Sequence, residues 1–138
     1  MEGWSNHVTV IGNLVRNCKK GIWITDRDPA TNSTQAPSKI TVVGNVVEDS
    51  EEEDIFLGYD VSVAPIYIPS DIIISNNVCN SSAEVGIWVA YGEGVSVLGN
   101  SLNGQDIGIQ IGDDNNQKPS GSWIINNNNI RGFSNHGI

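Results

Sequence analysis

The stretch Ile40-Thr41-Val42-Val43-Gly44-Asn45-Val46-Val47 (ITVVGNVV) decides the fold, because it recurs along the chain. Written as a rule, the repeat is apolar-x-apolar-x-Gly/Asn-Asn-x-apolar. The other copies are residues 8–15, 72–79, 95–102 and 123–130. Five copies of one pattern in 138 residues indicate a repeat protein, in which each copy packs on its neighbours.

The apolar residues before the Gly/Asn-Asn pair alternate with a period of two, which predicts a half-buried strand. One apolar residue after the pair, at the last position of the repeat, should continue the inward-facing set on a second short strand. The residues predicted to point inward before the pair are Val8 and Val10, Ile40 and Val42, Ile72 and Ile74, Val95 and Val97, and Trp123 and Ile125. Those predicted after it are Val15, Val47, Cys79, Leu102 and Ile130.

The Gly/Asn-Asn pair predicts a tight corner between these two strands. Its first residue is always Gly or Asn, the residues that enter the left-handed region of backbone conformation at the lowest cost. Its second residue is always Asn, whose amide needs hydrogen-bond partners if it is buried. Stacked copies can supply them as a ladder, each Asn bonding the Asn of the next turn. The ladder residues are Asn13, Asn45, Asn77, Asn100 and Asn128.

A second element follows each corner at a nearly constant distance and predicts a third strand. It reads Gly21-Ile22-Trp23-Ile24 in the first copy, and it returns at residues 54–57, 86–89, 108–111 and 137–138. The ladder asparagines stand 32, 32, 23 and 28 residues apart, so the coils share a design and differ in their loops. The variable connections are residues 26–39, 59–71, 91–94 and 113–122, all on one edge.

Three strands per coil, an Asn ladder at a tight corner and variable loops resemble the right-handed parallel β-helix of the pectate-lyase-like superfamily. The resemblance covers essentially the whole chain and implies an all-β solenoid of about five coils. It implies much less about chemistry, since related helices occur in polysaccharide lyases, glycosidases, epimerases, phage tailspikes and adhesins. In the resembled enzymes the substrate lies along the sheet made by the third strands, between loops of this kind.

The net charge of −9, with seven Lys and Arg, argues against nucleic acid and anionic membranes as partners, because both select basic patches. No apolar run approaches the roughly 18–20 residues of a membrane span. The acidity is compatible with Ca²⁺ and with neutral or metal-bridged glycans, and equally with a role in solubility alone.

The third strands carry the candidate binding residues. If the Ile residues of this element point inward, the residues between them point outward and stack from coil to coil. An aromatic strip edged by carboxylates is typical of a sugar-binding groove. The predicted substrate-binding residues are Trp23, Phe56, Trp88, Tyr91 and Gln110, with Trp88 and Tyr91 the least covered because the loop beside them is short. The alternative is that long loops or a partner chain cover these aromatic side chains.

Catalysis has weaker support. Two carboxylates about 5–9.5 Å apart can serve as acid and base in a glycosidase. The candidates are Glu93 paired with Asp60 or Asp113 on neighbouring coils, although exposed carboxylates at strand ends are more often solvated. The acidic run of residues 48–54 is interpreted as a solvated face that would hold Ca²⁺ only if its carboxylates converge. Cys79 is expected to pack as a small apolar residue, and a disulfide with Cys18 is not expected.

The ends of the sequence carry neither an amphipathic helix nor a polar cap that would cover open strand edges. We therefore expect residues 1–138 to be a single domain that is a fragment of a longer β-helix, or that stacks end to end with copies of itself. Two functions follow as expectations. One is a carbohydrate-binding or carbohydrate-active segment outside the cell or at its surface. The other is a structural rod, as in a tailspike or adhesin.

Overall fold

The computed structural model describes residues 7–26, 38–59, 68–112 and 121–138. These residues form fourteen strands and no helix, so the all-β prediction is confirmed and no described helix could cross a membrane. The strands fall into three parallel sheets. Sheet A contains β1 (Val8–Ile11), β4 (Ser38–Val43), β7 (Ser70–Ser75), β10 (Glu93–Leu98) and β13 (Trp123–Asn126). Sheet B contains β2 (Leu14–Cys18), β5 (Val46–Ser50), β8 (Val78–Asn80), β11 (Ser101–Asn103) and β14 (Asn129–Arg131). Sheet C contains β3 (Ile22–Asp26), β6 (Glu53–Tyr59), β9 (Val85–Val89) and β12 (Ile107–Ile111).

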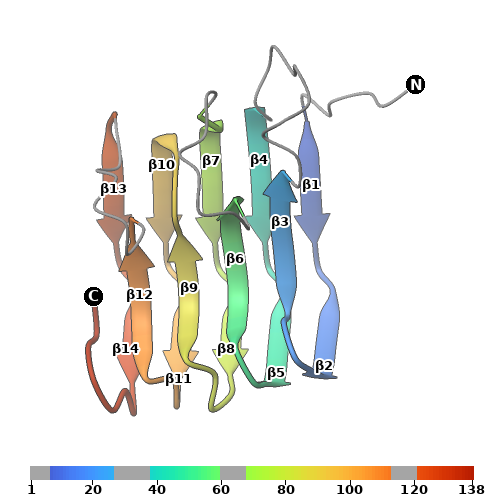
Figure 1. Cartoon of the computed structure of the whole chain (residues 1–138), viewed down its shortest axis with the longest axis vertical. Helices are drawn as coiled ribbons and strands as arrows, with labels where there is room; N and C mark the ends of the chain where they lie inside the picture. Colours follow the sequence, from blue (N-terminus) through green and yellow to red (C-terminus); the bar gives the residue numbers. More distant parts are fainter. Residues whose placement is uncertain (1–6, 27–37, 60–67, 113–120) are drawn as a thin grey trace.

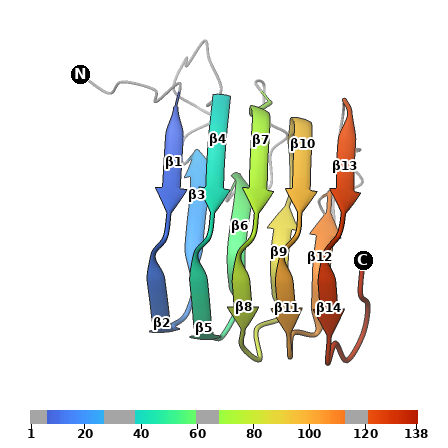
Figure 2. The same cartoon turned by 180° about the vertical axis from the view of Figure 1, so that it is seen from behind.

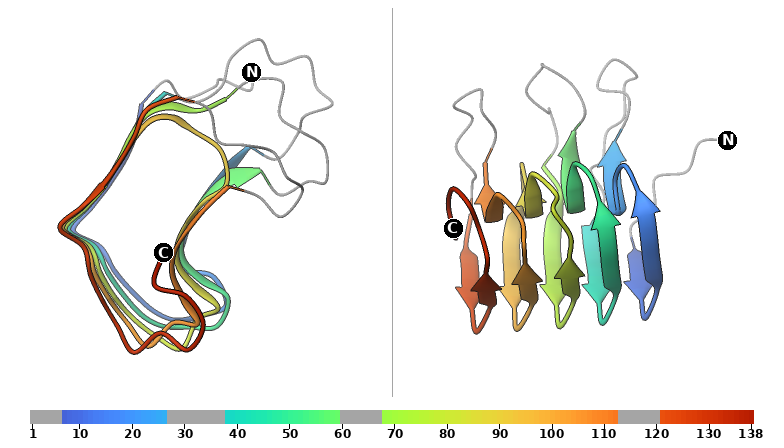
Figure 3. Two further views of the ribbon diagram at one scale, coloured as in Figure 1. Left: turned by 90° about the vertical axis from the view of Figure 1, so that its left-hand side faces the viewer. Right: turned by 90° about the horizontal axis from the view of Figure 1, so that it is seen from below.

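The chain runs through the three sheets in turn and then repeats, which makes a parallel β-helix (Figure 1). Coils 1 to 4 each contain three consecutive strands, and coil 5 contains β13, β14 and a bridge from His136 to Ile107. The chain descends through sheets A and B at the back and ascends through sheet C at the front while it moves from right to left, so the coil is right-handed (Figures 1 and 2). Viewed along the axis, the coils superimpose around one interior (Figure 3).

The interior is filled by the inward-facing residues that the alternation predicts. All fifteen predicted positions belong to one hydrophobic cluster, as buried or half-buried side chains in sheets A and B of coils 1 to 5. The register is in line throughout, for example Ile40 opposite Val8 on one side and Ile72 on the other. Burial is complete in coils 2 to 4 and partial in coils 1 and 5, because a terminal coil is covered on one side by described residues.

The corner between sheets A and B, called the A/B corner, contains the predicted Asn ladder. The side-chain amide nitrogen of Asn45 donates to Asn77 Oδ1 over 3.0 Å, and the backbone N–H of Asn45 donates to the same oxygen over 2.9 Å. The amide nitrogen also donates to the carbonyl oxygen of Val10 in the preceding coil. The residue before each ladder Asn has a positive φ, as at Gly44 (φ 65°) and Asn76 (φ 53°). Both the ladder and the left-handed corner are therefore confirmed.

Candidate functional site

The outer face of sheet C carries a row of aromatic side chains, one from each of the first three coils. Trp23 is in register with Phe56, Phe56 with Trp88, and Trp88 with Gln110. The ring centroids of Trp23 and Phe56 are 5.3 Å apart with planes at 40°, and those of Phe56 and Trp88 are 5.1 Å apart with planes at 76°. These are the offset and edge-to-face geometries that aromatic pairs prefer. We call Trp23, Phe56 and Trp88 the aromatic row.

Phe56 and Trp88 are followed two residues later by small residues, Gly58 and Ala90. A Cβ atom at Gly58 would lie 2.9 Å from the ring of Phe56 and 2.7 Å from the Cβ of Ala90. The ring of Phe56 therefore leans along its own strand and covers Gly58. The indole N–H of Trp88 donates to the carbonyl oxygen of Gly112 over 2.8 Å, which fixes this ring toward coil 4.

The aromatic row belongs to a second apolar cluster that is largely covered, so it is not open to a ligand along its whole length. Phe56 is 4% exposed and Tyr91 is 6% exposed, and both pack with Ala90, while Trp23 and Trp88 are half-buried against them. The outward direction predicted for the row is confirmed. The prediction that Tyr91 is among its least covered residues is wrong, because Tyr91 packs into this cluster at the end of β9.

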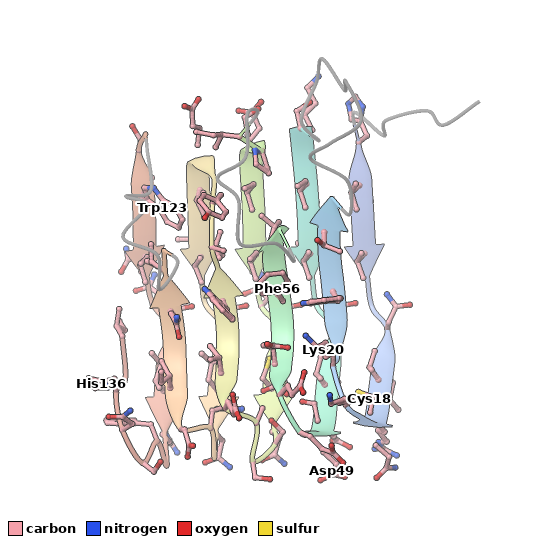
Figure 4. All side chains as sticks on the ribbon, viewed as in Figure 1. Cys18, Lys20, Asp49, Phe56, Trp123 and His136 are labelled. Atoms are coloured by element: carbon pink, nitrogen blue, oxygen red, sulfur yellow. The ribbon has the colours of Figure 1, made fainter. Side chains whose placement is uncertain are left out.

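Lys20 occupies the side of the row that lies nearest the N-terminal coil (Figure 4). Its ammonium nitrogen lies 3.8 Å from the centroid of the Trp23 ring, a cation–π contact. The same nitrogen is 3.2 Å from Glu52 Oε2, and it lies 3.4 Å from Glu53 Oε2, an ion-pair distance without hydrogen-bond geometry. The indole nitrogen of Trp23 is buried with no hydrogen-bond partner among the described residues. One face of Trp23 is therefore already occupied.

The acidic run at residues 48–54 is a solvated face only in part, because Asp49 and Glu51 are exposed while other members form ion pairs. Lys19 lies 2.6 Å from Glu52, and Arg16 lies 2.6 Å from Glu48. Hydrogen bonds from Lys19 and then Lys20 hold the pKa of Glu52 below its ordinary range. For Glu53, burial raises the pKa of the carboxyl group. The pairs follow from register, since coil 1 supplies the cations and coil 2 the carboxylates.

Asp54 differs most from the solvated position expected for this run. Its side chain points into the interior of the β-helix and is 0% exposed. Its carboxylate accepts hydrogen bonds from the hydroxyl group of Ser50 in coil 2 and from that of Ser81 in coil 3. The side-chain amide nitrogen of Gln105 in coil 4 donates to Asp54 Oδ2 over 2.8 Å. Burial raises the pKa of Asp54, and these three hydrogen bonds oppose the rise. We call Asp54, Ser50, Ser81 and Gln105 the Asp54 cluster.

A signal for this cluster was present in the sequence and was missed. The position of Asp54 in the third-strand element is occupied by glycine in the four other coils, at Gly21, Gly86, Gly108 and Gly137. At Gly21 the neighbouring backbones approach closely, since a Cβ atom there would lie 2.3 Å from the carbonyl oxygen of Asp54. The one ionisable residue in a column of inward glycines is therefore a buried carboxylate.

Only one of the three catalytic candidates, Glu93, lies within the described residues. Asp60 and Asp113 lie outside the described residues, as do Arg27 and the loops that contain them. Glu93 is the first residue of β10, is exposed, and is in register with Ser70 on sheet A. Glu93 therefore lies on sheet A, whereas the aromatic row lies on sheet C. Its pairing with Asp60 or Asp113 stays a prediction.

Metal donors are scattered within the described part of the chain. No group of three His, Cys, Asp or Glu residues that could hold a metal ion forms in residues 7–26, 38–59, 68–112 and 121–138. Cys79 is sealed in the core as predicted, and burial followed by the charge of Asp54 raises the pKa of its thiol well above the ordinary value. Cys18 is half-buried at the end of β2, and both cysteines are free thiols. His136 lies at the opposite end of the rod from Cys18 (Figure 4).

Comparisons with known proteins place this geometry in one family. No curated protein and no solved structure matches the chain. A family model matches residues 3–138, almost the full length, and its description is "Periplasmic copper-binding protein (NosD)". This family has the right-handed parallel β-helix of the pectate-lyase-like superfamily, in agreement with the coils described above. The chain is therefore a member of the NosD family of periplasmic copper-binding proteins.

Proposed function

We propose that this chain is a β-helical binding module that works outside the cytoplasmic membrane and takes a carbohydrate on sheet C. The observation that supports it is the aromatic row with Gln110 in register beside it. Aromatic faces stack on the apolar C–H faces of sugars, and an amide at the next position can bond the hydroxyl groups. The periplasmic description of the family agrees with a location at the cell envelope.

The geometry narrows the proposed site to the half of sheet C formed by coils 3 and 4. Phe56 is too covered to offer a ring face, and Lys20 occupies the ring of Trp23. Trp88 is half-buried, and its indole N–H is fixed by Gly112. A sugar ring would therefore stack on Trp88 and contact Gln110. Binding without bond cleavage is the function proposed, because Glu93 begins on sheet A.

The family description names copper, and the described residues do not fit a copper centre. Copper sites in proteins use thiolate, thioether and imidazole ligands held close together. Here the thiol of Cys79 is enclosed by core residues with a raised pKa, which disfavours the thiolate that binds metal. Calcium stays a prediction for the acidic residues, since no described group of three carboxylates converges. No step of the proposed function depends on either metal.

Affinity electrophoresis through gels with neutral and acidic polysaccharides, with and without Ca²⁺, tests the carbohydrate proposal. We expect at least one polysaccharide to retard the chain, and Trp88→Ala to weaken binding about tenfold, the loss of one stacking contact. Phe133→Ala is the matched control, because Phe133 is an exposed aromatic residue of coil 5 that does not belong to the aromatic row. Circular dichroism verifies that both variants fold. Absence of retardation on every gel, or equal retardation of Trp88→Ala, contradicts the proposal.

A second candidate, a rod that stacks end to end, is favoured by the direction of the Asn ladder. Each ladder Asn of coils 2 to 4 accepts at Oδ1 from the preceding coil and donates from its amide to the following one. A coil added before coil 1 would therefore bond Asn13, and one added after coil 5 would bond Asn128. Core residues are half-exposed at both ends, for example Val10 and Ile125.

Light scattering over a concentration series tests the stacking of this 138-residue chain. We expect the mean mass to rise with concentration, and Val10→Asp to suppress the rise because it places a charge on the end face. Thr9→Asp is the control, since Thr9 is exposed on the outer face of the same strand. A constant monomer mass at all concentrations rules out end-to-end stacking.

A further inference from the structure

The Asp54 cluster contains a carboxylate that is enclosed in the middle of the β-helix and has no cation beside it among the described residues. It lies inside the corner between sheets B and C, called the B/C corner, and it joins three coils. Asp54 is 0% exposed and Gln105 is 1% exposed, and Ser50 and Ser81 are also buried. A buried carboxylate is costly unless it is paired or protonated.

No described positive charge faces the carboxylate of Asp54. The nearest cation in sequence register, Lys20, lies on the outer side of the corner and pairs with Glu52 and Glu53. The titratable groups that face Asp54 from packed strands are the thiols of Cys18 on β2 and Cys79 on β8, and the charge of Asp54 raises the pKa of both. On the side of coil 1 the neighbour is Gly21, which precedes β3 and whose backbone lies against the carbonyl oxygen of Asp54. The donors to Asp54 are therefore uncharged hydroxyl and amide groups.

The cluster also contains a buried acceptor that has no donor. Gln105 donates from its amide nitrogen to Asp54 Oδ2 over 2.8 Å and to the carbonyl oxygen of Cys79 over 3.2 Å. Its Oε1 atom is buried with no hydrogen-bond partner among the described residues. A protonated Asp54 would add one O–H donor to this cluster. Serine hydroxyl groups can reverse from donor to acceptor, so Ser50 or Ser81 can accept the hydrogen bond of a protonated Asp54.

The members of the Asp54 cluster touch one another directly, and this leaves room for a proton but not for a larger cation. Ser81 Oγ lies 2.7 and 2.8 Å from the two oxygens of Asp54, so the hydroxyl, amide and carboxylate groups already touch. A metal ion would require these groups to separate, whereas a proton adds to a carboxylate oxygen within the existing contacts. We propose that the Asp54 cluster is a buried proton-binding site, which fastens coils 2, 3 and 4 together when Asp54 is protonated and loosens them when the proton leaves.

The direction of the pH effect follows from linkage. The folded chain holds the proton of Asp54 at pH values at which the unfolded chain has already released it. The resulting stability is complete below the ordinary carboxyl range near pH 4, and it is lost as pH rises through the higher pKa of the folded state. This is opposite to the behaviour of a carboxylate in a salt bridge, such as Glu52, whose stabilisation is lost on acidification.

Carboxyl-detected NMR titration of the full chain tests the proton site directly, with Asp54→Asn used to assign the resonance. We expect one aspartate carboxyl to titrate above the ordinary range and its signal to be missing from Asp54→Asn. The matched control is Asp49→Asn, an exposed residue of the same acidic run with a positive φ of 57°, which Asn tolerates well. This variant should keep the high-titrating signal. If every aspartate titrates within the ordinary range, the proposal is wrong.

Urea denaturation of the same three proteins between pH 4 and pH 8 tests the effect on the coils. We expect the midpoint of the wild-type chain to fall as pH rises, the midpoint of Asp49→Asn to fall in parallel, and that of Asp54→Asn to depend much less on pH. The control accounts for the general repulsion of a chain with a net charge of −9. Equal pH dependence in Asp54→Asn and Asp49→Asn overturns the proposal. If Asp54→Asn does not fold, the wild-type titration alone decides it.

Discussion

The A/B corner and the B/C corner both bury polar side chains inside the same β-helix, and they satisfy them by different means. At the A/B corner each buried amide is bonded by the same residue type in the next coil, as Asn45 is by Asn77 and Asn77 by Asn100. At the B/C corner a single carboxylate, Asp54, depends on three different residues from three coils. A polar residue that recurs in every coil finds its hydrogen-bond partner in the next copy of itself. A polar residue that occurs once needs a different residue type as its partner in each neighbouring coil.

The two corners should also differ in how their contribution to stability responds to pH. The Asn ladder carries no titratable group, so protonation changes nothing in it. The Asp54 cluster holds a group whose charged form is disfavoured by burial. One corner should therefore contribute the same free energy of unfolding at every pH near neutrality, and the other a pH-dependent amount. The predictions below test this contrast, in order of decreasing effect.

The largest effect is expected from Asn77→Ala in the middle of the ladder. The change leaves the backbone and side-chain N–H groups of Asn45 without their acceptor and the carbonyl oxygen of Val42 without its donor. Each buried group left unpaired costs about 1–3 kcal/mol, so we expect the free energy of unfolding to fall by roughly 3–4 kcal/mol. Urea denaturation at pH 5 and pH 8 should give the same loss. Asn76→Gly at the neighbouring exposed position, with its positive φ, should change little.

Gly21→Ala should have the next largest effect, because it tests close packing at the B/C corner. The added Cβ would lie 2.3 Å from the carbonyl oxygen of Asp54 and 2.7 Å from Val47 Cγ1. Since these are backbone and core atoms, coils 1 and 2 must separate. We expect a loss of about 2–3 kcal/mol in denaturation. A variant as stable as the wild type would show that the B/C corner can yield without cost.

Gln105→Met should produce a smaller loss that depends on pH. It removes the amide donor to Asp54 and to the carbonyl oxygen of Cys79 while keeping a side chain of similar size. A hydrogen bond to a charged group contributes about 1.5–3 kcal/mol, so the loss should be near 2 kcal/mol at pH 8. It should be smaller at pH 4, because the raised pKa of Asp54 favours its protonated form in acid. A loss that is equal at both pH values would mean that Asp54 keeps one charge state throughout.

Gly44→Asn should have the smallest effect and completes the comparison of corner glycines. A Cβ atom at Gly44 would meet nothing within 4 Å, and the positive φ of 65° is a conformation that Asn adopts readily. The same column already contains Asn76 and Asn127 with positive φ. We expect a change below about 1 kcal/mol. A larger loss would mean that the A/B corner needs glycine for a reason other than its backbone conformation.

The residues that were predicted well are those that the repeat specifies more than once. The alternation at Ile40 and Val42 and the Gly44-Asn45 corner were interpreted correctly because the same residue types recur at the same positions in the other coils. The position of the Asp54 side chain was not predicted. Asp54 stands at the end of an acidic run in the sequence, and a run of charged residues is usually solvated. The coverage of Tyr91 was also missed, because its burial depends on packing in a cluster with Phe56 of the preceding coil.

The sequence by itself determined the parallel β-helix, its three strands per coil, its inward-facing residues and its Asn ladder. Periodicity is sufficient for these features, since each coil offers its neighbours the side chains that it needs from them. Only the tertiary structure decided that Lys20 covers Trp23, that the aromatic row packs on itself, and that Asp54 meets Ser81 and Gln105. These contacts join different residues from different coils, so their partners depend on register and on side-chain direction, which no single copy of the repeat contains.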